Sequence, residues 1–244
     1  MSENITQTDS CKIEGFLGVT TQRRKSRCPA RLDLIQSGTG IFLGLFMWLH
    51  MLFVSTILFG EDMFNRVVYM FEMRFISNSP AMSYLTMIVA IGVLIIFFVH
   101  ALLGMRKMPI SFRQWQAYRA HAKRMNHPDT NLWLIQAITG FIMFFLASAH
   151  LCIIAFSGEL SAEISATRVS THLMFLFYLV LLFAVELHGG IGLYRVCAKW
   201  GFFEGKDAKE SRQKLIKARN FISVVFLVLG ILNLIVFIKI GFKL

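Results

Sequence analysis

Residues 34–50 read LIQSGTGIFLGLFMWLH, and residues 134–150 read LIQAITGFIMFFLASAH. Both stretches begin with the same Leu-Ile-Gln and continue to a Thr-Gly pair. In both, a histidine follows that glycine by ten residues, at His50 and His150. Neither stretch carries a charged residue before its histidine, so each predicts a long apolar helix with a polar motif at one end and a histidine toward the other.

Besides the two copies of this repeat, three further segments are apolar and long enough to span a bilayer, which takes about 20 helical residues. We expect an all-α integral membrane protein with five transmembrane helices. Residues 1–32 form a polar N-terminal segment, and residues 33–244 form one transmembrane domain. The predicted spans are residues 33–59, 81–105, 131–156, 170–197 and 218–238.

The composition excludes most soluble protein classes. Of the 244 residues, 56% are hydrophobic and only 16% are charged, whereas soluble domains have about 25% charged residues. The net charge of +11 does not indicate nucleic acid binding, because the basic residues lie in short runs between apolar segments. The N-terminus does not resemble a cleaved signal peptide, so we expect the mature chain to start near Met1.

The basic residues predict the orientation in the membrane. Of the 25 Lys and Arg residues, 20 lie in the N-terminal segment, between Arg106 and Arg124, or between Arg195 and Arg219. Positively charged loops stay in the cytoplasm. We therefore predict that the N-terminus lies in the cytoplasm and the C-terminus on the outer side of the membrane.

The second and fourth predicted spans repeat a weaker pattern, in which a histidine is followed four residues later by a glycine. These residues are His100 with Gly104 and His188 with Gly192. Such glycines leave room for a macrocycle or for close helix packing. Since both copies of the two-helix unit start on the same side, the first four helices are expected to form a bundle with a pseudo-two-fold axis along the membrane normal.

Four histidines inside membrane spans indicate a functional site, because ionisable side chains are costly there. At about 1.5 Å of rise per residue, His50 and His150 lie near the outer face, and His100 and His188 lie roughly 15 Å deeper toward the inner face. The pseudo-two-fold axis pairs His50 with His150 and His100 with His188. Each pair predicts a bis-histidine b haem, and two stacked haems would form an electron path. The alternative is that each histidine is a polar residue bonded within the helix packing.

The four cysteines form no CxxC or CxxCH motif, so a bound haem would be non-covalent. Two carboxylates are also candidates. Glu186 lies within the fourth span, where it either carries protons or is a neutral, hydrogen-bonded residue. Glu72 precedes the second span on the outer side, where it either accepts protons from a quinol or is a solvated loop acid.

Polar and aromatic residues at the inner ends of the spans are placed to hold the propionates of an inner haem. The same residues would also serve as interfacial anchors. They are Gln36, Ser37, Lys107, Trp133 and Lys199.

Four runs of the chain, taken together and in order, closely resemble the single-subunit, two-haem cytochrome b anchor of bacterial fumarate reductase and succinate dehydrogenase complexes. The resemblance covers nearly the whole chain. The runs are SGTGIFLGLFMWLHMLFVSTIL (37–58), HALLGMRKMPISFRQ (100–114), LWLIQAITGFIMFFLASAHL (132–151) and YLVLLFAVELHGGIGLYR (178–195).

This resemblance implies a subunit of a quinol:fumarate reductase that binds two b haems and oxidises menaquinol. It implies two partners, a flavoprotein with FAD and an iron–sulfur subunit, with the dicarboxylate chemistry on the flavoprotein. It also implies that Glu72 accepts protons from the quinol, that Glu186 serves a proton path, and that the five inner-end residues contact the propionates. The sequence leaves open the direction of the reaction, the quinone species and whether the complex is a dimer.

Two other functions remain as alternatives. The first is the haem b anchor of a hydrogenase or formate dehydrogenase, which also uses transmembrane histidines but with other spacings. The second, more remote, is a haem-free transporter with parallel repeats and Glu186 as its coupling site.

Overall fold

The computed structural model describes residues 27–74, 84–109, 111–125 and 127–243. Most of the expected N-terminal segment and the first three residues of the predicted second span lie outside these ranges. All regular elements in the described ranges are helical, and five helices are long and apolar enough to cross a membrane. The predicted all-α, five-span fold is therefore confirmed.

The five long helices lie where the sequence predicts the spans. Their bounds are α2 (Cys28–Val54), continued by the 3₁₀ turn η1 (Ser55–Phe59), α4 (Tyr84–Met105), α6 (Pro128–Ala155), α8 (Met174–Trp200) and α9 (Ala208–Gly241). The main difference is that α9 starts at Ala208 rather than near residue 218. Its polar first turns form because the Asp207 side chain accepts hydrogen bonds from the backbone N–H groups of Lys209 and Glu210.

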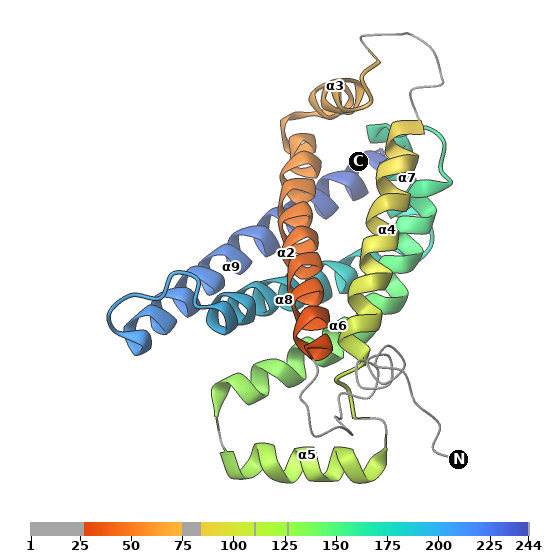
Figure 1. The fold of residues 1–244 in the computed structure, drawn as a ribbon. Coiled ribbons are helices and arrows are strands. Elements are labelled where there is room, and N and C mark those ends of the chain that lie inside the picture. Colours follow the sequence, from red (N-terminus) through yellow and green to blue (C-terminus); the bar gives the residue numbers. More distant parts are fainter. Residues whose placement is uncertain (1–26, 75–83, 110, 126, 244) are drawn as a thin grey trace, which may run out of the picture.

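Three shorter helices lie in connections where the sequence predicts no regular structure. They are α3 (Glu61–Phe71), α5 (Phe112–Met125) and α7 (Ala162–Ser170). Figure 1 shows α3 and α5 running crosswise at opposite ends of the bundle. These helices are short and polar, and each buries at most a narrow stripe of side chains, so long apolar segments do not indicate them.

Helices α2, α4, α6 and α8 form a four-helix ring. Along this ring α2 packs against α4, α4 against α6, α6 against α8, and α8 against α2. Helices α2 and α6 therefore lie on one diagonal, and α4 and α8 lie on the other. This arrangement matches the pseudo-two-fold bundle that the internal repeat predicts.

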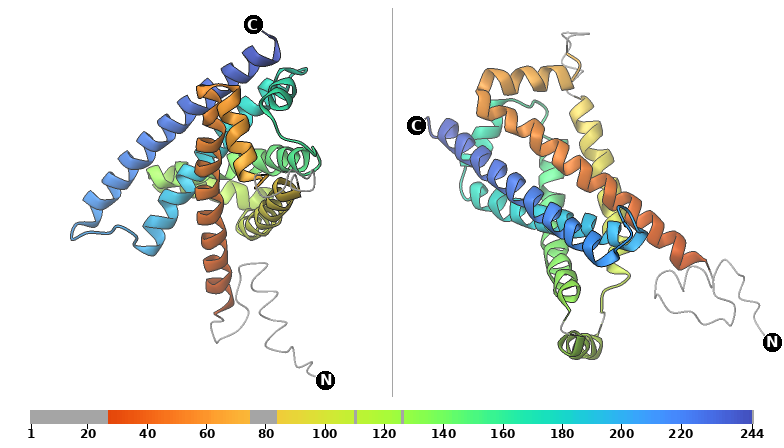
Figure 2. Two further views of the ribbon diagram at one scale, coloured as in Figure 1. Left: turned by 90° about the horizontal axis from the view of Figure 1, so that it is seen from above. Right: turned by 90° about the vertical axis from the view of Figure 1, so that its left-hand side faces the viewer.

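Helix α9 lies outside the ring, along α8 (Figures 1 and 2). At the end of the bundle that the sequence predicts to face outward, called the outer end below, α9 joins a buried apolar cluster with η1, α3 and α7. The members of this cluster are Ile57, Phe64, Val68, Ala162, Ala166, Val169 and Phe237. A hydrogen bond of 2.8 Å from the Ala162 backbone N–H to the Asn65 side chain ties α7 to α3. The outer end is thus closed by packed short helices.

Candidate functional site

The structure brings the four membrane histidines together as two pairs, one on each diagonal of the ring. The His50 ring on α2 faces the His150 ring on α6, with centroids 6.2 Å apart. The His100 ring on α4 faces the His188 ring on α8, with centroids 6.3 Å apart. Phe46 stacks on His50, and Tyr178 meets His150 edge-on.

The repeated Leu-Ile-Gln motif holds the inner pair. The backbone carbonyl of Gln36 lies 3.2 Å from Nδ1 of His100, and that of Gln136 lies 2.9 Å from Nδ1 of His188. A ring nitrogen facing a carbonyl oxygen carries the proton, so Nδ1 donates in both cases and Nε2 is left as a potential metal ligand. Partners of this kind orient histidine ligands in metal sites.

The glycine that ends each copy of the motif lets the histidine approach. A Cβ atom on Gly40 would lie 2.9 Å from Cε1 of His100, and one on Gly140 would lie 2.8 Å from Cε1 of His188. Both distances are well below ordinary contact, which is about 3.5–4.0 Å. The Thr-Gly end of the repeat is therefore explained by the inner histidines on the neighbouring helices, and not by the outer histidines that follow in the same helices.

The glycines that follow the inner histidines lie next to the glutamine side chains of the repeated motif. The Gln36 side-chain amide lies 3.5 Å from where a Cβ of Gly104 would stand, and that of Gln136 lies 3.0 Å from the same point of Gly192. The Gln136 amide also accepts a hydrogen bond of 2.8 Å from Nη1 of Arg195. A side chain at either glycine would therefore contact the glutamine of the neighbouring helix.

The distances within both pairs fit an iron bound between two imidazole rings. Metal–nitrogen bonds of about 2 Å, with about 1.1 Å from each ring nitrogen to its centroid, put the two centroids about 6 Å apart. In the outer pair, Nδ1 of His150 is buried and has no hydrogen-bond partner among the described residues. A haem iron without an open position takes two such protein ligands.

At the inner end, two of the predicted propionate donors bind a carboxylate of this chain. Nζ of Lys107 lies 2.7 Å from Oδ1 of Asp33, and Nζ of Lys199 lies 2.9 Å from Oδ2. Arg106, whose side chain is only 7% exposed, also binds Oδ1. Two cations from the turn after α4 and one from α8 thus share one carboxylate near the start of α2.

The other predicted inner-end residues fall into two places. Ser37 is buried and accepts a hydrogen bond of 3.0 Å from the indole of Trp200, so it lies beside the Asp33 cluster. Trp133 instead packs against Tyr118 of α5, with ring centroids 4.5 Å apart and the ring planes tilted by 48°. The structure groups Gln36, Ser37, Lys107 and Lys199 near the start of α2, whereas Trp133 packs on α5.

Glu72 is not a solvated loop acid. It follows the last residue of α3 at the outer end of the bundle and is fully buried. Thr86 of α4 donates a hydrogen bond of 2.9 Å to Oε1, and Nε of Arg74 lies 2.7 Å from Oε2. A buried, ion-paired carboxylate at this end can accept a proton from a group beside it.

Glu186 is buried where α8 meets α9 and α2. Its side chain lies next to the Ser223 hydroxyl of α9 and the Trp48 indole of α2. Its Oε1 atom and the Trp48 indole nitrogen have no direct hydrogen-bond partner within the described residues. The carboxyl group therefore retains an unsatisfied oxygen deep in a membrane span.

Several residues that shape this site were not predicted from the sequence. Asp33 is the acid on which the inner cations converge, and Gln136 mirrors Gln36 across the pseudo-two-fold axis. Applying the repeat to polar residues as well as histidines would have found Gln136. Asp33 carries a weaker signal, namely a carboxylate beside the basic end of an apolar span.

Comparison with known proteins identifies the family. Residues 112–230 match the sequence model of the succinate dehydrogenase/fumarate reductase transmembrane subunit family. The chain is 44% identical over 237 residues to the fumarate reductase cytochrome b subunit of Wolinella succinogenes, covering 97% of this chain and 92% of that protein. It is 42% identical over 234 residues to the subunit of the same name from Helicobacter pylori, covering 95% of this chain and 89% of that protein.

These likenesses extend over almost the full length of the chain. They also agree with the five membrane-spanning helices of the structure. The chain therefore belongs to the family of succinate dehydrogenase/fumarate reductase transmembrane subunits, among the fumarate reductase cytochrome b subunits.

Proposed function

We propose that this chain is the dihaem cytochrome b anchor of a quinol:fumarate reductase. In this function it oxidises menaquinol near the outer histidine pair and delivers the electrons toward the cytoplasmic side. A flavoprotein with FAD and an iron–sulfur subunit bind at that side and carry out the dicarboxylate chemistry. The chain lies in a bacterial inner membrane with its N-terminus in the cytoplasm.

One observation carries this proposal, namely that histidines from four different helices meet as two pairs at separations of 6.2 and 6.3 Å. Histidines bonded only within the helix packing would not need to face each other across the diagonals of the bundle. His50 and His150 would hold the outer iron, and His100 and His188 the inner iron. Two bound b haems would supply one-electron transfer between the two ends of the bundle.

The residues around the inner pair support ligation through Nε2. The Gln36 and Gln136 carbonyls fix the ring orientation of His100 and His188, and the glycines of the repeat allow the rings to sit close to the neighbouring helix. Gln36, Ser37, Lys107 and Lys199 provide donors for propionates at this end. We also assign Trp133 to this role. Unlike the other four residues, it packs against Tyr118 of α5.

Quinol oxidation releases two protons with its two electrons, so the outer site needs a proton acceptor. We assign this role to Glu72, which lies at the outer end of the bundle, next to the start of α4. Arg74 stabilises its carboxylate form, and Thr86 fixes the orientation of Oε1. Burial keeps bulk water from competing for the carboxylate.

We assign Glu186 to a path that moves protons across the membrane as electrons pass through the bundle. Its carboxyl group is buried beside the Trp48 indole of α2 and the Ser223 hydroxyl of α9. A carboxyl group in such a place can exchange a proton at modest cost with a water or hydroxyl beside it.

The purified complex tests the haem assignment directly. Quantified b haem should amount to two per chain, and a redox titration should resolve two components. His50→Ala should remove one component and His100→Ala the other. The exposed histidine His172 provides the matched control, since His172→Ala should leave both components in place. A complex with one haem or none per chain would contradict the proposal.

A second comparison isolates the role of Glu72. Glu72→Gln should retain both haems but lower menaquinol-dependent fumarate reduction at least tenfold, because general base catalysis contributes about 10²–10⁴-fold. Glu61→Gln changes an exposed acid at the other end of α3 and should behave like the unaltered complex. Equal activity of the two variants would remove Glu72 from the proton path.

The partners that co-purify with the chain separate the alternatives. A flavoprotein and an iron–sulfur protein are expected. A nickel or molybdenum protein would instead favour a hydrogenase or formate dehydrogenase anchor. A chain without haem absorbance would return the transporter to consideration.

A further inference from the structure

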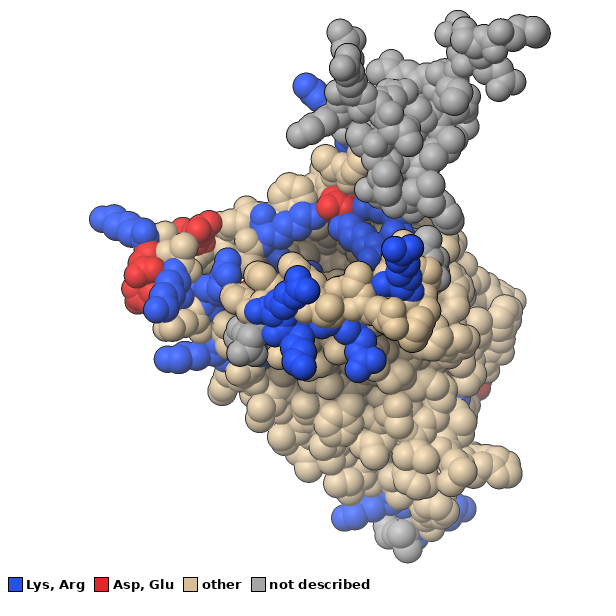
Figure 3. Space-filling model, turned by 90° about the horizontal axis from the view of Figure 1, so that it is seen from below, with Lys and Arg blue, Asp and Glu red and all other residues tan. Residues whose placement is uncertain are grey.

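Helix α5 lies crosswise at the basic end of the bundle and packs against the start of α6 (Figure 1). Its sequence, FRQWQAYRAHAKRM, contains four Lys and Arg residues and no acid. Figure 3 shows Lys and Arg side chains gathered around a hollow at this end, with far fewer acidic ones. A basic amphipathic helix in this position is typical of the membrane interface.

Aromatic contacts fix α5 on α6. Tyr118 meets Trp115 edge-on and packs at a tilt against Trp133, and its hydroxyl donates a hydrogen bond of 3.3 Å to the backbone carbonyl of Thr130. Trp and Tyr side chains concentrate at the headgroup level of a bilayer. We therefore place the junction of α5 and α6 at the level of the lipid headgroups.

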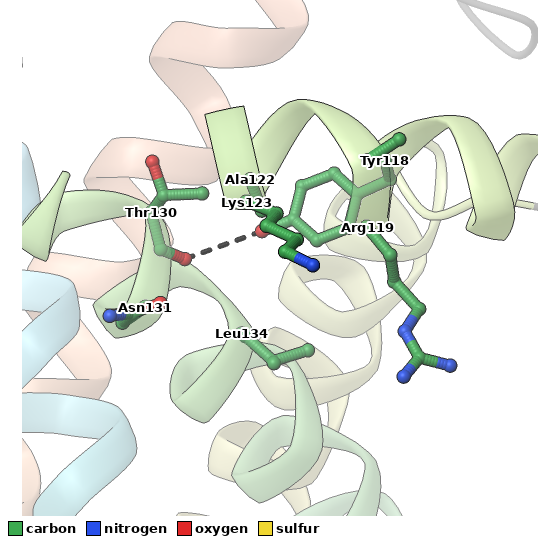
Figure 4. Close-up of a pocket in the computed structure, with 8 residues that line it drawn as sticks. Tyr118, Arg119, Ala122, Lys123, Thr130, Asn131 and Leu134 are labelled. Carbon is green, nitrogen blue, oxygen red and sulfur yellow. Dashed lines mark hydrogen bonds between the residues drawn. The ribbon is translucent and has the colours of Figure 1, made fainter. Parts of the chain in front are cut away.

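A pocket of about 400 Å³ opens at this junction. Its polar lining comes from Arg119 and Lys123 on α5 and from Thr130 and Asn131 on α6, and Leu134 adds an apolar wall. Figure 4 shows the Arg119 and Lys123 side chains reaching from α5 toward the side on which α6 runs. No carboxylate lines the pocket among the residues that the structure describes.

Arg119 and Lys123 are the two basic residues that line the pocket. Arg106, Lys107 and Lys199 all pair with the single carboxylate of Asp33, and Arg212 lies 3.5 Å from a carboxylate oxygen of Asp129. In the described part of the chain, neither Arg119 nor Lys123 forms an ion pair. The pocket therefore offers two unneutralised cations to an anion.

The surface beyond the pocket indicates what kind of molecule carries that anion. Leu134 begins a stripe along α6 that continues through Ile138, Phe141 and Phe145, at the spacing of one helix face. These last three side chains are 53%, 67% and 57% exposed. The stripe leads from the cations into the depth of the bilayer, which suits acyl chains and not an acidic protein surface.

We propose that this pocket binds an anionic phospholipid. Arg119 and Lys123 hold the phosphate, Asn131 donates a further hydrogen bond, and the acyl chains lie along the Leu134–Phe145 stripe. Basic pockets between helices on the cytoplasmic side are suited to such headgroups. The site is separate from the histidine pairs and does not depend on the haem assignment.

The test uses the delipidated whole complex, and native mass spectrometry counts the lipids that bind during titration with phosphatidylglycerol. Arg119→Gln/Lys123→Gln should weaken binding about thirtyfold, since each basic side chain near an anionic headgroup contributes about fivefold. Arg113→Gln/Arg124→Gln removes the same charge from the same helix outside the pocket and should change binding less than about threefold. Phosphatidylcholine should bind equally to all three complexes.

Three results would overturn the proposal. Equal weakening by both double variants would mean a diffuse charge effect. Displacement of phosphatidylglycerol by millimolar inorganic phosphate would mean a site for free anions. Loss of the iron–sulfur subunit from the pocket variant, with lipid binding intact, would mean that the surface belongs to a subunit interface.

Discussion

Replacing Gly140 by alanine should disturb the inner histidine pair selectively. The new Cβ would stand 2.8 Å from Cε1 and 3.0 Å from Nδ1 of His188. Since ordinary contact begins near about 3.5 Å, the ring has to retreat by about 0.7 Å. The hydrogen bond of 2.9 Å from Nδ1 to the Gln136 carbonyl resists this movement. Overpacking of this kind costs about 1–3 kcal/mol, which corresponds to about 5- to 150-fold weaker retention of the inner haem.

The chain supplies its own controls for this prediction. Gly38 lies in the same repeat, and no atom lies within 4 Å of the point where a Cβ would stand there, so Gly38→Ala should leave both haem components unchanged. Gly40→Ala crowds His100, the other member of the inner pair, and should therefore affect the same component as Gly140→Ala. Helix stability should not fall in any of the three variants, because alanine is the better helix former by about 1 kcal/mol.

The measurement is a reduced-minus-oxidised b-haem spectrum per chain, resolved by redox titration. Loss or shift of one component in both Gly40→Ala and Gly140→Ala, with the other unchanged, is the expected result. The reasoning fails if Gly140→Ala keeps both components at their original potentials. It also fails if the two variants affect different components.

Buried polar contacts give three further predictions. Asp33→Asn should destabilise the chain by about 2 kcal/mol, because it leaves the buried Arg106 without its carboxylate. As a control, Glu210→Gln breaks an exposed pair with Lys214 and should change the melting temperature little. Glu186→Gln should keep its haem but lose at least tenfold in quinol-dependent fumarate reduction, and normal turnover would leave Glu186 as a neutral packing residue. Asn233→Ala should lower the free energy of unfolding by about 0.6–1.7 kcal/mol in a denaturation assay, because it removes the hydrogen bond of 3.0 Å to Ser55. The double variant with Ser55→Ala should be no less stable than the less stable single variant.

The sequence predicted the parts of this fold that depend on long apolar segments and on repetition. The five spans follow from hydrophobicity alone, and the histidine pairing follows from the alignment of residues 34–50 with residues 134–150. The structure places the paired rings on the diagonals of the bundle, as the pseudo-two-fold axis requires.

Features that depend on backbone atoms and on short helices could not be predicted in this way. The carbonyls of Gln36 and Gln136 act through the main chain, so their role does not depend on a recognisable side chain. The burial of Glu72 depends on α3, whose eleven residues are too few and too polar to be predicted as a membrane span from hydrophobicity. Similarly, the convergence of Lys107 and Lys199 on Asp33 requires the helix ends to meet in space.

The contacts of the four-helix ring have a consequence for assembly. The Gln36–His100 bond joins α2 to α4, and the Gln136–His188 bond joins α6 to α8. On the proposed ligation, one iron joins α2 to α6 and the other joins α4 to α8, so the four links form a closed circuit. A circuit with one link missing would still connect all four helices, whereas without either iron only packing contacts would join the α2–α4 pair to the α6–α8 pair. On this proposal, a bundle with either haem bound would already have all four helices joined by a hydrogen bond or an iron.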